Sequence, residues 1–320
     1  MSMPRTATLE EIKAALPKID LLAEMESAFL SYSRGECVIP PVGELILDEE
    51  YPGEVHIKYG YARGGAHYVV KIASGFPLNK ELGLPTGNGL MLLFDVRTGE
   101  LSSILLDECF LTEARTAAAG ALASRTLAPS AVERIGIIGT GMQAHMQLEY
   151  GAKALACTKA VVWGRTPEHV NQFKDDFAQS QVSVESAKDI REVTESCQVI
   201  VMCTPATEPL LQTDWVRPGT HITAMGSDTP EKQELDTALL GRADRVVVDS
   251  LDQGRIRGEV AQALRAGTIT ENDVVELGAV LDDPAQGRSS DDEITVADLT
   301  GVAIQDLRIA EAVTRCLGNS

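Results

Sequence analysis

The stretch Arg134-Ile-Gly-Ile-Ile-Gly-Thr-Gly-Met-Gln-Ala144 decides the fold of this 320-residue chain. Its first half is a short apolar run typical of a buried strand, and its second half opens a helix through Gly139 and Gly141. Gly139 permits a tight turn, Gly141 lets the backbone approach a ligand closely, and Ala144 is small enough for the helix to pack on the strand. The pattern predicts a loop that binds the pyrophosphate of a dinucleotide at a helix N-terminus.

Downstream of this loop, short apolar runs alternate with helical segments. Parallel strands joined by crossover helices produce this alternation, because a parallel connection needs a dozen or more residues. We therefore predict an α/β fold with a doubly wound, Rossmann-type parallel sheet. Its expected strands are residues 135–138, 160–163, 182–184, 199–203, 221–224 and 245–248.

The residues before the loop follow a different pattern, which predicts helices and then a largely antiparallel sheet. Residues 8–33 show helical spacing that is interrupted at Pro17. Short strand-like runs follow, separated by turns rich in glycine and proline. We interpret Gly87-Asn-Gly89 as a turn and not a phosphate loop, because a strand and not a helix follows it. The expected strands are residues 44–47, 54–58, 68–72, 90–95 and 101–106.

Two further helices define the predicted domain boundaries. An alanine-rich helix is expected at residues 112–127, before a break at Pro129, and a last helix is expected at residues 303–316. We predict that residues 1–128 and 302–320 form a mixed α+β domain that binds substrate and pairs with a second subunit through exposed sheet edges. Residues 129–301 form the Rossmann-type dinucleotide-binding domain, inserted between those two parts.

Composition and charge exclude several classes of partner. The net charge of −19 disfavours nucleic acid and anionic membrane surfaces, because both are negatively charged. The six cysteines lack the spacing of a zinc site or a disulfide framework, so we expect reduced thiols and no metal. No apolar run is long enough for a membrane helix. The N-terminal residues lack the apolar stretch of a signal peptide, which favours the cytoplasm.

The predicted cofactor site includes residues after several strands, because ligands bind at the carboxyl edge of such sheets. An NAD-specific fold commonly has an acidic residue at the adenosine ribose, where this chain has Gly164, Arg165 and Thr166. Arg165 could bind the 2′-phosphate of NADP. It could equally stack on the adenine of NAD, so the sequence is compatible with either cofactor. The predicted cofactor-binding set is Gly139, Thr140, Gly141, Met142, Gln143, Gly164, Arg165, Thr166, Thr204, Met225 and Gly226.

Several segments together carry a resemblance to a known family. They are Val69-Val-Lys-Ile-Ala-Ser-Gly-Phe76, Leu111-Thr-Glu-Ala-Arg-Thr-Ala-Ala-Ala119, the glycine loop, residues 224–236 and the C-terminal run 288–306. In this order they are similar to the ornithine cyclodeaminase and mu-crystallin family over nearly the whole chain. The resemblance implies reversible hydride transfer between a nicotinamide and the carbon that bears an amine or imine beside a carboxylate. It also implies a homodimer built through the first domain.

The resemblance also implies roles for three residues. Lys71 and Arg115 correspond to cations that hold the substrate carboxylate, with Lys71 also able to move a proton, and Asp228 corresponds to the acid or base at the substrate nitrogen. Such residue types fit the chemistry, since a carboxylate needs a cationic clamp and an imine needs a proton donor. Structural alternatives remain for each residue. Lys71 could lie on a solvated strand face, Arg115 could pair with Glu113 or cap a helix, and Asp228 could be a loop residue or the N-cap of a helix near Pro230.

One departure from the family pattern concerns the substrate clamp. Family members that act on simple amino acids usually have a further arginine in the segment that corresponds to residues 39–45, and this chain has none there. His56 and Lys58 lie on one face of the next predicted strand. We hypothesise that Lys58 replaces the missing cation and that His56 assists it. The alternative is that both are surface residues.

The segments around Lys58 and Lys71 are most similar to those of an iminosuccinate reductase, which converts iminosuccinate to L-aspartate. A substrate with two carboxylates would explain the additional cation. The alternatives within the family are an alanine dehydrogenase, a cyclic ketimine reductase and an ornithine cyclodeaminase. A mu-crystallin-like protein that binds NADP without turnover is the alternative of another class.

Overall fold

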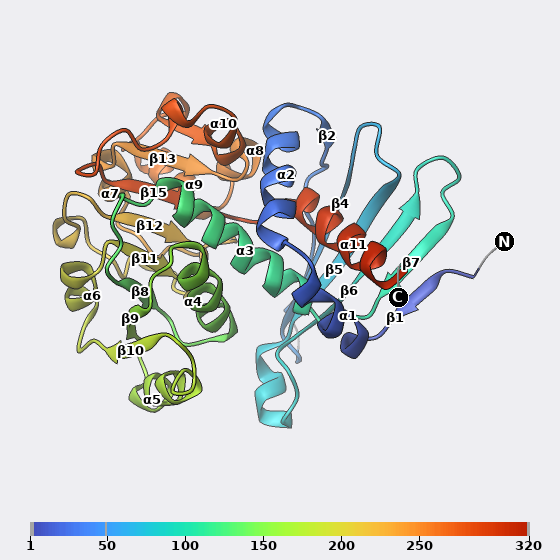
Figure 1. Cartoon of the computed structure of the whole chain (residues 1–320), viewed down its shortest axis with the longest axis horizontal. Coiled ribbons are helices and arrows are strands. Elements are labelled where there is room, and N and C mark those ends of the chain that lie inside the picture. Colours follow the sequence, from blue (N-terminus) through green and yellow to red (C-terminus); the bar gives the residue numbers. More distant parts are fainter. Residues whose placement is uncertain (1–2, 49, 319–320) are drawn as a thin grey trace. The chain divides into compact units, whose positions relative to one another are not determined.

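The computed structural model of the chain describes residues 3–48 and 50–318 (Figure 1). Contacts divide the chain into unit 1, Met1–Arg115 with Val302–Ser320, and unit 2, Thr116–Gly301. The sequence placed the first division after residue 128, whereas the structure places it inside helix α3 (Phe110–Leu127). The cause is the last part of α3, where the Ser124 hydroxyl lies 3.0 Å from that of Thr223 and the Leu127 carbonyl accepts a bond from Arg288.

Unit 1 begins with two helices separated by the expected break. Helix α1 spans Leu9–Ala15 and α2 spans Leu21–Ser33, with a 3₁₀ turn at Leu16–Lys18 between them. Thr8 caps α1, because its hydroxyl accepts the Glu11 N–H while the Glu11 carboxylate accepts the Thr8 N–H. Pro17 cannot continue an α-helix and instead starts the tighter turn.

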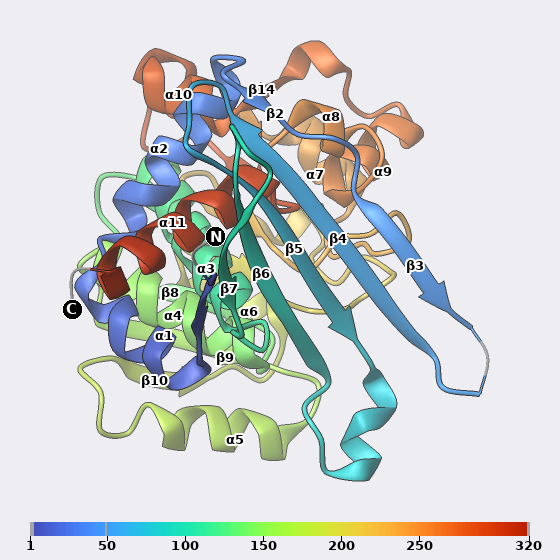
Figure 2. The same cartoon turned by 90° about the vertical axis from the view of Figure 1, so that its right-hand side faces the viewer.

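The sheet of unit 1 has the order β1-β7-β6-β5-β4-β2, and β3 also pairs with β4 (Figure 2). Every pairing is antiparallel except that of β1 with β7. The five predicted strands are present, whereas the short strands β1 and β2 were not predicted. The strands are β1 (Arg5–Ala7), β2 (Cys37–Val38), β3 (Gly43–Leu47), β4 (Gly53–Ala62), β5 (His67–Gly75), β6 (Gly87–Asp95) and β7 (Leu101–Leu105).

The prediction of a turn at Gly87-Asn-Gly89 was wrong, because these residues are the first part of β6. Gly89 is required there for close packing. A Cβ at this position would lie 2.4 Å from the Ile72 carbonyl oxygen and 2.9 Å from the Cys109 sulfur. Gly89 therefore lets β5 and the loop after β7 approach β6 closely, which is a common use of glycine within a strand.

The two faces of this sheet differ in burial. On one face, Lys58, Lys71, Met91 and Leu105 are in register across four strands, and all four are buried. Helix α11 (Ala303–Gly318) packs on strands β4, β5 and β6 and beside α2. The side chains of the neighbouring positions point to the other face and are partly buried or exposed; these residues are Tyr59, Val70, Leu92 and Ile104.

Unit 2 contains an eight-stranded sheet with the order β10-β9-β8-β11-β12-β15-β13-β14, in which every pairing is parallel. The predicted Rossmann-type sheet is confirmed. The chain order reverses between β8 and β11, which is the point where such sheets bind ligands. The strands are β8 (Ile135–Ile138), β9 (Lys159–Trp163), β10 (Ser183–Ser186), β11 (Val199–Met202), β12 (His221–Ala224), β13 (Arg245–Val248), β14 (Val274–Glu276) and β15 (Thr295–Asp298).

Helices and 3₁₀ turns connect these strands, and apolar cores lie against the sheet, one including Ile200 and Val296 and another including Ile137 and Phe173. The helices are α4 (Met142–Ala154), α5 (Pro167–Asp176), α6 (Ile190–Ser196), α7 (Thr237–Arg242), α8 (Leu251–Gly254), α9 (Gly258–Ala266) and α10 (Leu277–Asp282). The 3₁₀ turns are Pro77–Leu82 in unit 1 and Thr213–Trp215, Glu271–Asp273 and Pro284–Gln286 in unit 2. Within the described ranges, no helix is both long and apolar enough to cross a membrane.

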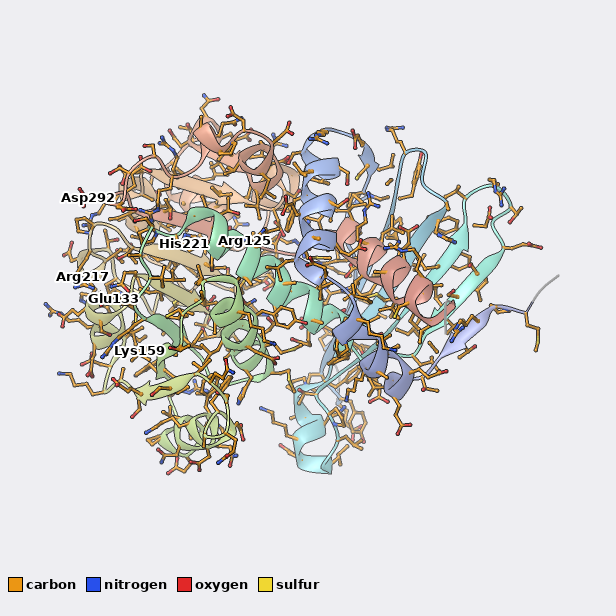
Figure 3. All side chains as sticks on the ribbon, viewed as in Figure 1. Arg125, Glu133, Lys159, Arg217, His221 and Asp292 are labelled. Atoms are coloured by element: carbon orange, nitrogen blue, oxygen red, sulfur yellow. The ribbon has the colours of Figure 1, made fainter. Side chains whose placement is uncertain are left out.

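His221, labelled in Figure 3, begins β12 as the sequence predicted. Its ring nitrogens lie 2.8 Å from the Thr295 hydroxyl and 2.9 Å from the Thr223 hydroxyl. Burial and the nearby charge of Arg288 lower its pKa to about 3. The imidazole is therefore neutral at physiological pH and serves the packing of the sheet.

Candidate functional site

The glycine loop has the geometry that a bound pyrophosphate requires. Gly139 has a φ of 125°, and a Cβ there would lie 2.7 Å from the Cys203 carbonyl oxygen, so only glycine fits. Gly141 is the N-cap of α4 and provides no side chain for the first N–H groups of the helix. A Cβ at Gly141 would meet nothing within 4 Å, so the space beside this glycine is open. An anionic group fits this position.

The residues predicted for the adenosine end of the site, Gly164, Arg165 and Thr166, lie between β9 and α5. Gly164 packs against the loop, because a Cβ there would lie 2.6 Å from the Thr140 side chain. Arg165 is exposed, and Thr166 is the N-cap of α5 without a side-chain capping bond. Of the remaining loop residues, Met142 is exposed and Gln143 accepts a bond of 3.2 Å from Gln147.

A buried carboxylate joins the loops that follow β11 and β12. One oxygen of Glu234 accepts bonds from the Thr204 N–H at 2.6 Å and from its hydroxyl at 2.8 Å, and the other oxygen accepts the Gly226 N–H at 2.8 Å. Met225, between β12 and Gly226, is half-buried. Burial raises the pKa of Glu234 to about 7. Sequence reasoning missed Glu234, although it lies in the family-like run 224–236.

Asp228 lies in the loop after β12, at the carboxyl edge of the sheet. Its carboxylate is 2.6 Å from the Lys232 ammonium, and its side chain is half exposed. The N-cap alternative is wrong, because residues 229–235 form no helix and α7 is capped by Asp236. The Arg257 guanidinium donates a bond of 3.3 Å to the Asp228 carbonyl, which holds the loop from outside.

Lys71 and Arg115 belong to a buried group of charges in unit 1. Lys71 is 3% exposed and Arg115 is 4% exposed, so the alternative of a solvated lysine is wrong. Arg115 donates through Nε to Asp306 Oδ1 at 3.0 Å and through Nη1 to Gln305 at 3.4 Å. Burial lowers the pKa of Lys71, partly offset by the charge of Asp306. A lysine with a lowered pKa gives up its proton more readily than an exposed one.

Two carboxylates complete this group, and sequence reasoning assigned neither to the site. Asp306 is fully buried, and its Oδ2 has no hydrogen-bond partner within the described part of the chain. Asp107 accepts the Leu111 N–H at 2.9 Å, and burial raises its pKa to about 6. Cys109, which follows shortly after Asp107, has a φ of 70°, and a non-glycine residue in this region stores strain that is frequent at functional sites.

Lys58 and His56 share a face of β4 as predicted, but their surroundings differ. Lys58 is directly opposite Lys71 across the β4–β5 pair and is 9% exposed, so it is not a surface residue. Like charges at opposite positions of a sheet repel each other, and a bound anion would relieve this repulsion. His56 is half-buried, with ring nitrogens 3.7 Å from Glu44 and 3.4 Å from Glu54.

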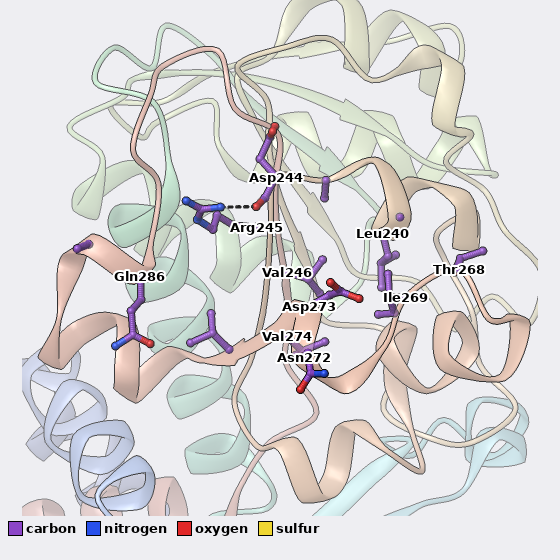
Figure 4. Close-up of a pocket in the computed structure, with 14 residues that line it drawn as sticks. Leu240, Asp244, Arg245, Val246, Thr268, Ile269, Asn272, Asp273, Val274 and Gln286 are labelled. Carbon is purple, nitrogen blue, oxygen red and sulfur yellow. Dashed lines mark hydrogen bonds between the residues drawn. The ribbon is translucent and has the colours of Figure 1, made fainter.

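A groove of about 580 Å³ lies elsewhere in unit 2, at the amino end of β13 (Figure 4). Its lining includes Asp244, whose carbonyl accepts a bond of 2.7 Å from Arg245, together with Asp273 and Gln286. None of the predicted site residues lines this groove. It lies at the edge opposite to the one where Rossmann-type sheets bind ligands.

Known proteins resemble this chain over nearly its whole length. Residues 4–318 match the model of the ornithine cyclodeaminase/mu-crystallin family. The iminosuccinate reductase of Paracoccus denitrificans is 36% identical over 292 residues, which cover 90% of this chain and 89% of that protein. The crystal structure of the Paracoccus denitrificans iminosuccinate reductase in complex with NAD⁺ covers 99% of this chain and 97% of that chain, with a TM-score of 0.89 and 32% identity.

A second solved structure, an archaeal alanine dehydrogenase dimer with bound NAD, has a TM-score of 0.89 and 31% identity. The match covers 99% of this chain and 96% of that chain. The family model, the sequence relative and the solved structures agree with each other and with the geometry of the glycine loop. The chain therefore belongs to the ornithine cyclodeaminase/mu-crystallin family.

Proposed function

We propose that this chain is a nicotinamide-dependent imino acid reductase that converts iminosuccinate to L-aspartate. The observation that carries the proposal is the pair of buried lysines, Lys58 and Lys71, directly opposite each other on the sheet of unit 1. Two ammonium groups on the same face of a sheet attract anionic ligands, because like charges at opposite positions repel each other. A dicarboxylate is such a ligand, and the related protein is named an iminosuccinate reductase.

Arg115 is the residue that we assign to the carboxylate beside the imine. Asp306 accepts from its Nε and Gln305 accepts a bond of 3.4 Å from its Nη1, and a substrate carboxylate would take the terminal nitrogens in place of that longer bond. A planar guanidinium on a rigid helix recognises a carboxylate in a bidentate manner. Lys58 and Lys71 then bind the second carboxylate, so that each end of the substrate has its own cationic partner.

The proton chemistry is assigned to Asp228 and Lys71. Reduction of an imine to an amine consumes one proton at nitrogen, and a positioned acid lowers the barrier. Asp228, held at the carboxyl edge of the sheet, acts as the acid or base at that nitrogen. Lys71 also moves a proton, which its lowered pKa favours. Lys232 keeps the Asp228 carboxylate in place through their ion pair.

The cofactor that we propose is NAD, held by the glycine loop and the N-terminus of α4. When bound, it supplies the hydride. NAD is favoured because both solved structures compared with this chain contain it. Arg165 is exposed at the adenosine end, so binding of NADPH is also expected. The ratio of the dissociation constants for NADH and NADPH measures this preference directly.

The assembly that we propose is a homodimer formed through the open face of the unit 1 sheet. This face is apolar, with Tyr59 and Val70 in register and with Tyr68 stacked on Phe94 at 4.8 Å between ring centroids. Partly exposed apolar side chains gathered on one face of a sheet are typical of an interaction surface, and the archaeal relative is a dimer. Light scattering of the purified protein tests this, and a monomer mass contradicts it.

The reaction is tested with imino acids formed from ammonia and oxaloacetate, pyruvate or glyoxylate, and with a cyclic ketimine. Rapid NADH oxidation only with the oxaloacetate-derived imine supports iminosuccinate reduction. Preference for the pyruvate-derived imine favours an alanine dehydrogenase, which the archaeal relative represents. Ammonia release from ornithine with NAD favours a cyclodeaminase. Cofactor binding without turnover of any substrate favours a binding protein.

Lys58→Met sharpens the test, because it removes one cation and keeps the length of the side chain. We expect kcat/KM for the oxaloacetate-derived imine to fall by about 10-fold or more, as for the loss of a hydrogen bond to a charged group. Turnover of a monocarboxylate imine should change little. Lys18→Met is the matched control, because Lys18 is exposed, and it should leave kcat/KM for both substrate types unchanged. An equal loss for both substrate types removes Lys58 from dicarboxylate recognition.

A further inference from the structure

We propose that Glu234 is a positioning residue that sets the two loops after β11 and β12, and with them the nicotinamide side of the site. The proposal rests on the proposed function in one respect, namely that Thr204 and Gly226 contact the cofactor. Glu234 itself is fully buried and reaches both loops, so it acts through them.

The carboxylate divides its oxygens between the two loops. Oε1 accepts both donors of Thr204, and Oε2 accepts the Gly226 N–H. Strands β11 and β12 are neighbours in the sheet, with Met202 opposite Ala224, so these loops leave the sheet side by side. The two oxygens of a carboxyl group can accept from both loops, whereas a glutamine amide would present hydrogens to one loop.

Gly226 supports the same assignment independently. A Cβ at this position would lie 2.1 Å from the Thr204 carbonyl oxygen and 2.6 Å from Glu234 Cδ. The absence of a side chain thus provides the space that the Glu234 carboxyl group occupies. The glycine is needed here for the carboxylate as well as for the close approach of the two loops.

Two further carboxylates stand behind Glu234 and hold it in the same manner. Glu259 accepts the N–H groups of Glu234 at 2.7 Å and Leu235 at 3.1 Å. Asp298, at the end of β15, accepts the Val260 N–H at 2.8 Å. Each carboxylate therefore fixes the backbone that carries the next one. The series connects the carboxyl end of β15 to the loops that follow β11 and β12.

The loop that contains Asp228 is closed by the same contact. It follows β12, and the hydrogen bond between Gly226 and Glu234 joins its two ends. Within it, the Ser227 hydroxyl donates to the Lys232 carbonyl at 2.7 Å. A change at Glu234 therefore reaches Asp228 through the backbone, without direct contact between the reacting atoms and Glu234.

Hydrogen exchange of the full-length protein without cofactor provides a readout that is independent of turnover. In Glu234→Gln we expect faster exchange in peptides that contain residues 203–206 and 225–228, because an amide cannot accept from both loops. Peptides from unit 1 should not change. Glu231→Gln is the matched control, because Glu231 is exposed in the same loop. Unchanged exchange at residues 203–206 and 225–228 would overturn the proposal.

Cofactor binding is then measured by titration with NADH, followed by its fluorescence. Glu234→Gln should raise the dissociation constant by about 10-fold, as expected for lost bonds to a charged group, and Glu231→Gln should leave it unchanged. If the Glu234→Gln variant does not fold, Glu234→Asp replaces it in both experiments. Aspartate keeps the charge but is too short to reach both loops, so this variant should also exchange faster and bind NADH more weakly. Failure of the wild-type protein to bind NADH contradicts the proposed function, whereas the exchange result alone decides the role of Glu234.

Discussion

Asp306→Asn tests the buried charge group of unit 1 most directly. The substitution keeps the size of the side chain and removes the negative charge that faces Arg115. In the structure, Arg115 Nε lies 3.0 Å from Asp306 Oδ1, and the two side chains are 5% and 0% exposed. The charge of Asp306 also raises the pKa of Lys71. The substitution therefore leaves two buried cations without their compensating anion.

Removing one member of a buried ion pair costs about 3–5 kcal/mol, because the remaining charge stays desolvated. For a unit of this size, 1 kcal/mol corresponds to about 4 °C in the unfolding midpoint, so we expect a decrease of about 10–20 °C. Arg115→Met should lower the free energy of unfolding by a similar amount. In the double variant no charge of the pair remains, and the loss should be smaller than the sum of the two single losses by about 2 kcal/mol or more.

Thermal and urea unfolding of the wild-type protein and the three variants measure this cycle. Asp252→Asn is the matched control, because it breaks an ion pair with Arg255 whose side chains are 80% and 45% exposed, and little change is expected. If Asp306→Asn lowers the midpoint no more than the control does, or if the two single losses simply add, the pair does not carry the stability inferred from its burial.

Two further predictions concern catalysis and pH. Asp228→Asn should lower kcat/KM by about 100-fold while the dissociation constant for NADH stays unchanged; an unaltered kcat/KM would remove Asp228 from the chemistry. Burial raises the pKa of Glu234 to about 7 and that of Glu259 to about 8, above the ordinary value of 4.5. The folded state therefore holds protons that the unfolded state releases, so the contribution of these groups to stability is greatest below pH 4.5 and falls as the pH rises to about 8. The glutamine of the Glu259→Gln variant does not titrate. The difference in the free energy of unfolding between the wild type and this variant should therefore shrink between pH 5 and pH 8.5. A constant difference would contradict the raised pKa.

Much of the fold follows from local patterns in the sequence. The glycine loop, five strands of unit 1 and six strands of unit 2 were predicted because their apolar spacing or turn residues are local signals. Strand β15 was missed although it is an interior strand of the sheet, because Thr295-Val-Ala-Asp298 is short and has polar residues at both ends. Its place depends on pairing with β12 and β13, which no local pattern specifies.

Some candidate site residues could also be predicted from local patterns, whereas others depend on contacts between distant parts of the chain. Lys71 was predicted with the help of family-like neighbours, and alternation indicated that it is at least half-buried. The opposition of Lys58 to Lys71 was not predicted, because it depends on the register of β4 and β5. Asp306 was not assigned to Arg115 because 191 residues separate them. Glu234 was missed because its function depends on backbone N–H groups, which every sequence contains.

Unit 1 consists of two separate parts of the chain, and this determines the order in which the molecule is completed during synthesis. The helix that carries Arg115 leaves the ribosome long before α11, which carries Asp306 and covers the sheet. Domains fold as units once their chain is available, and unit 2 is therefore complete while unit 1 still has an open apolar face and an unpaired guanidinium. The nascent chain therefore completes the sheet of unit 2 first, and Arg115 gains its Asp306 partner last, so products truncated before α11 keep a buried cation without this partner.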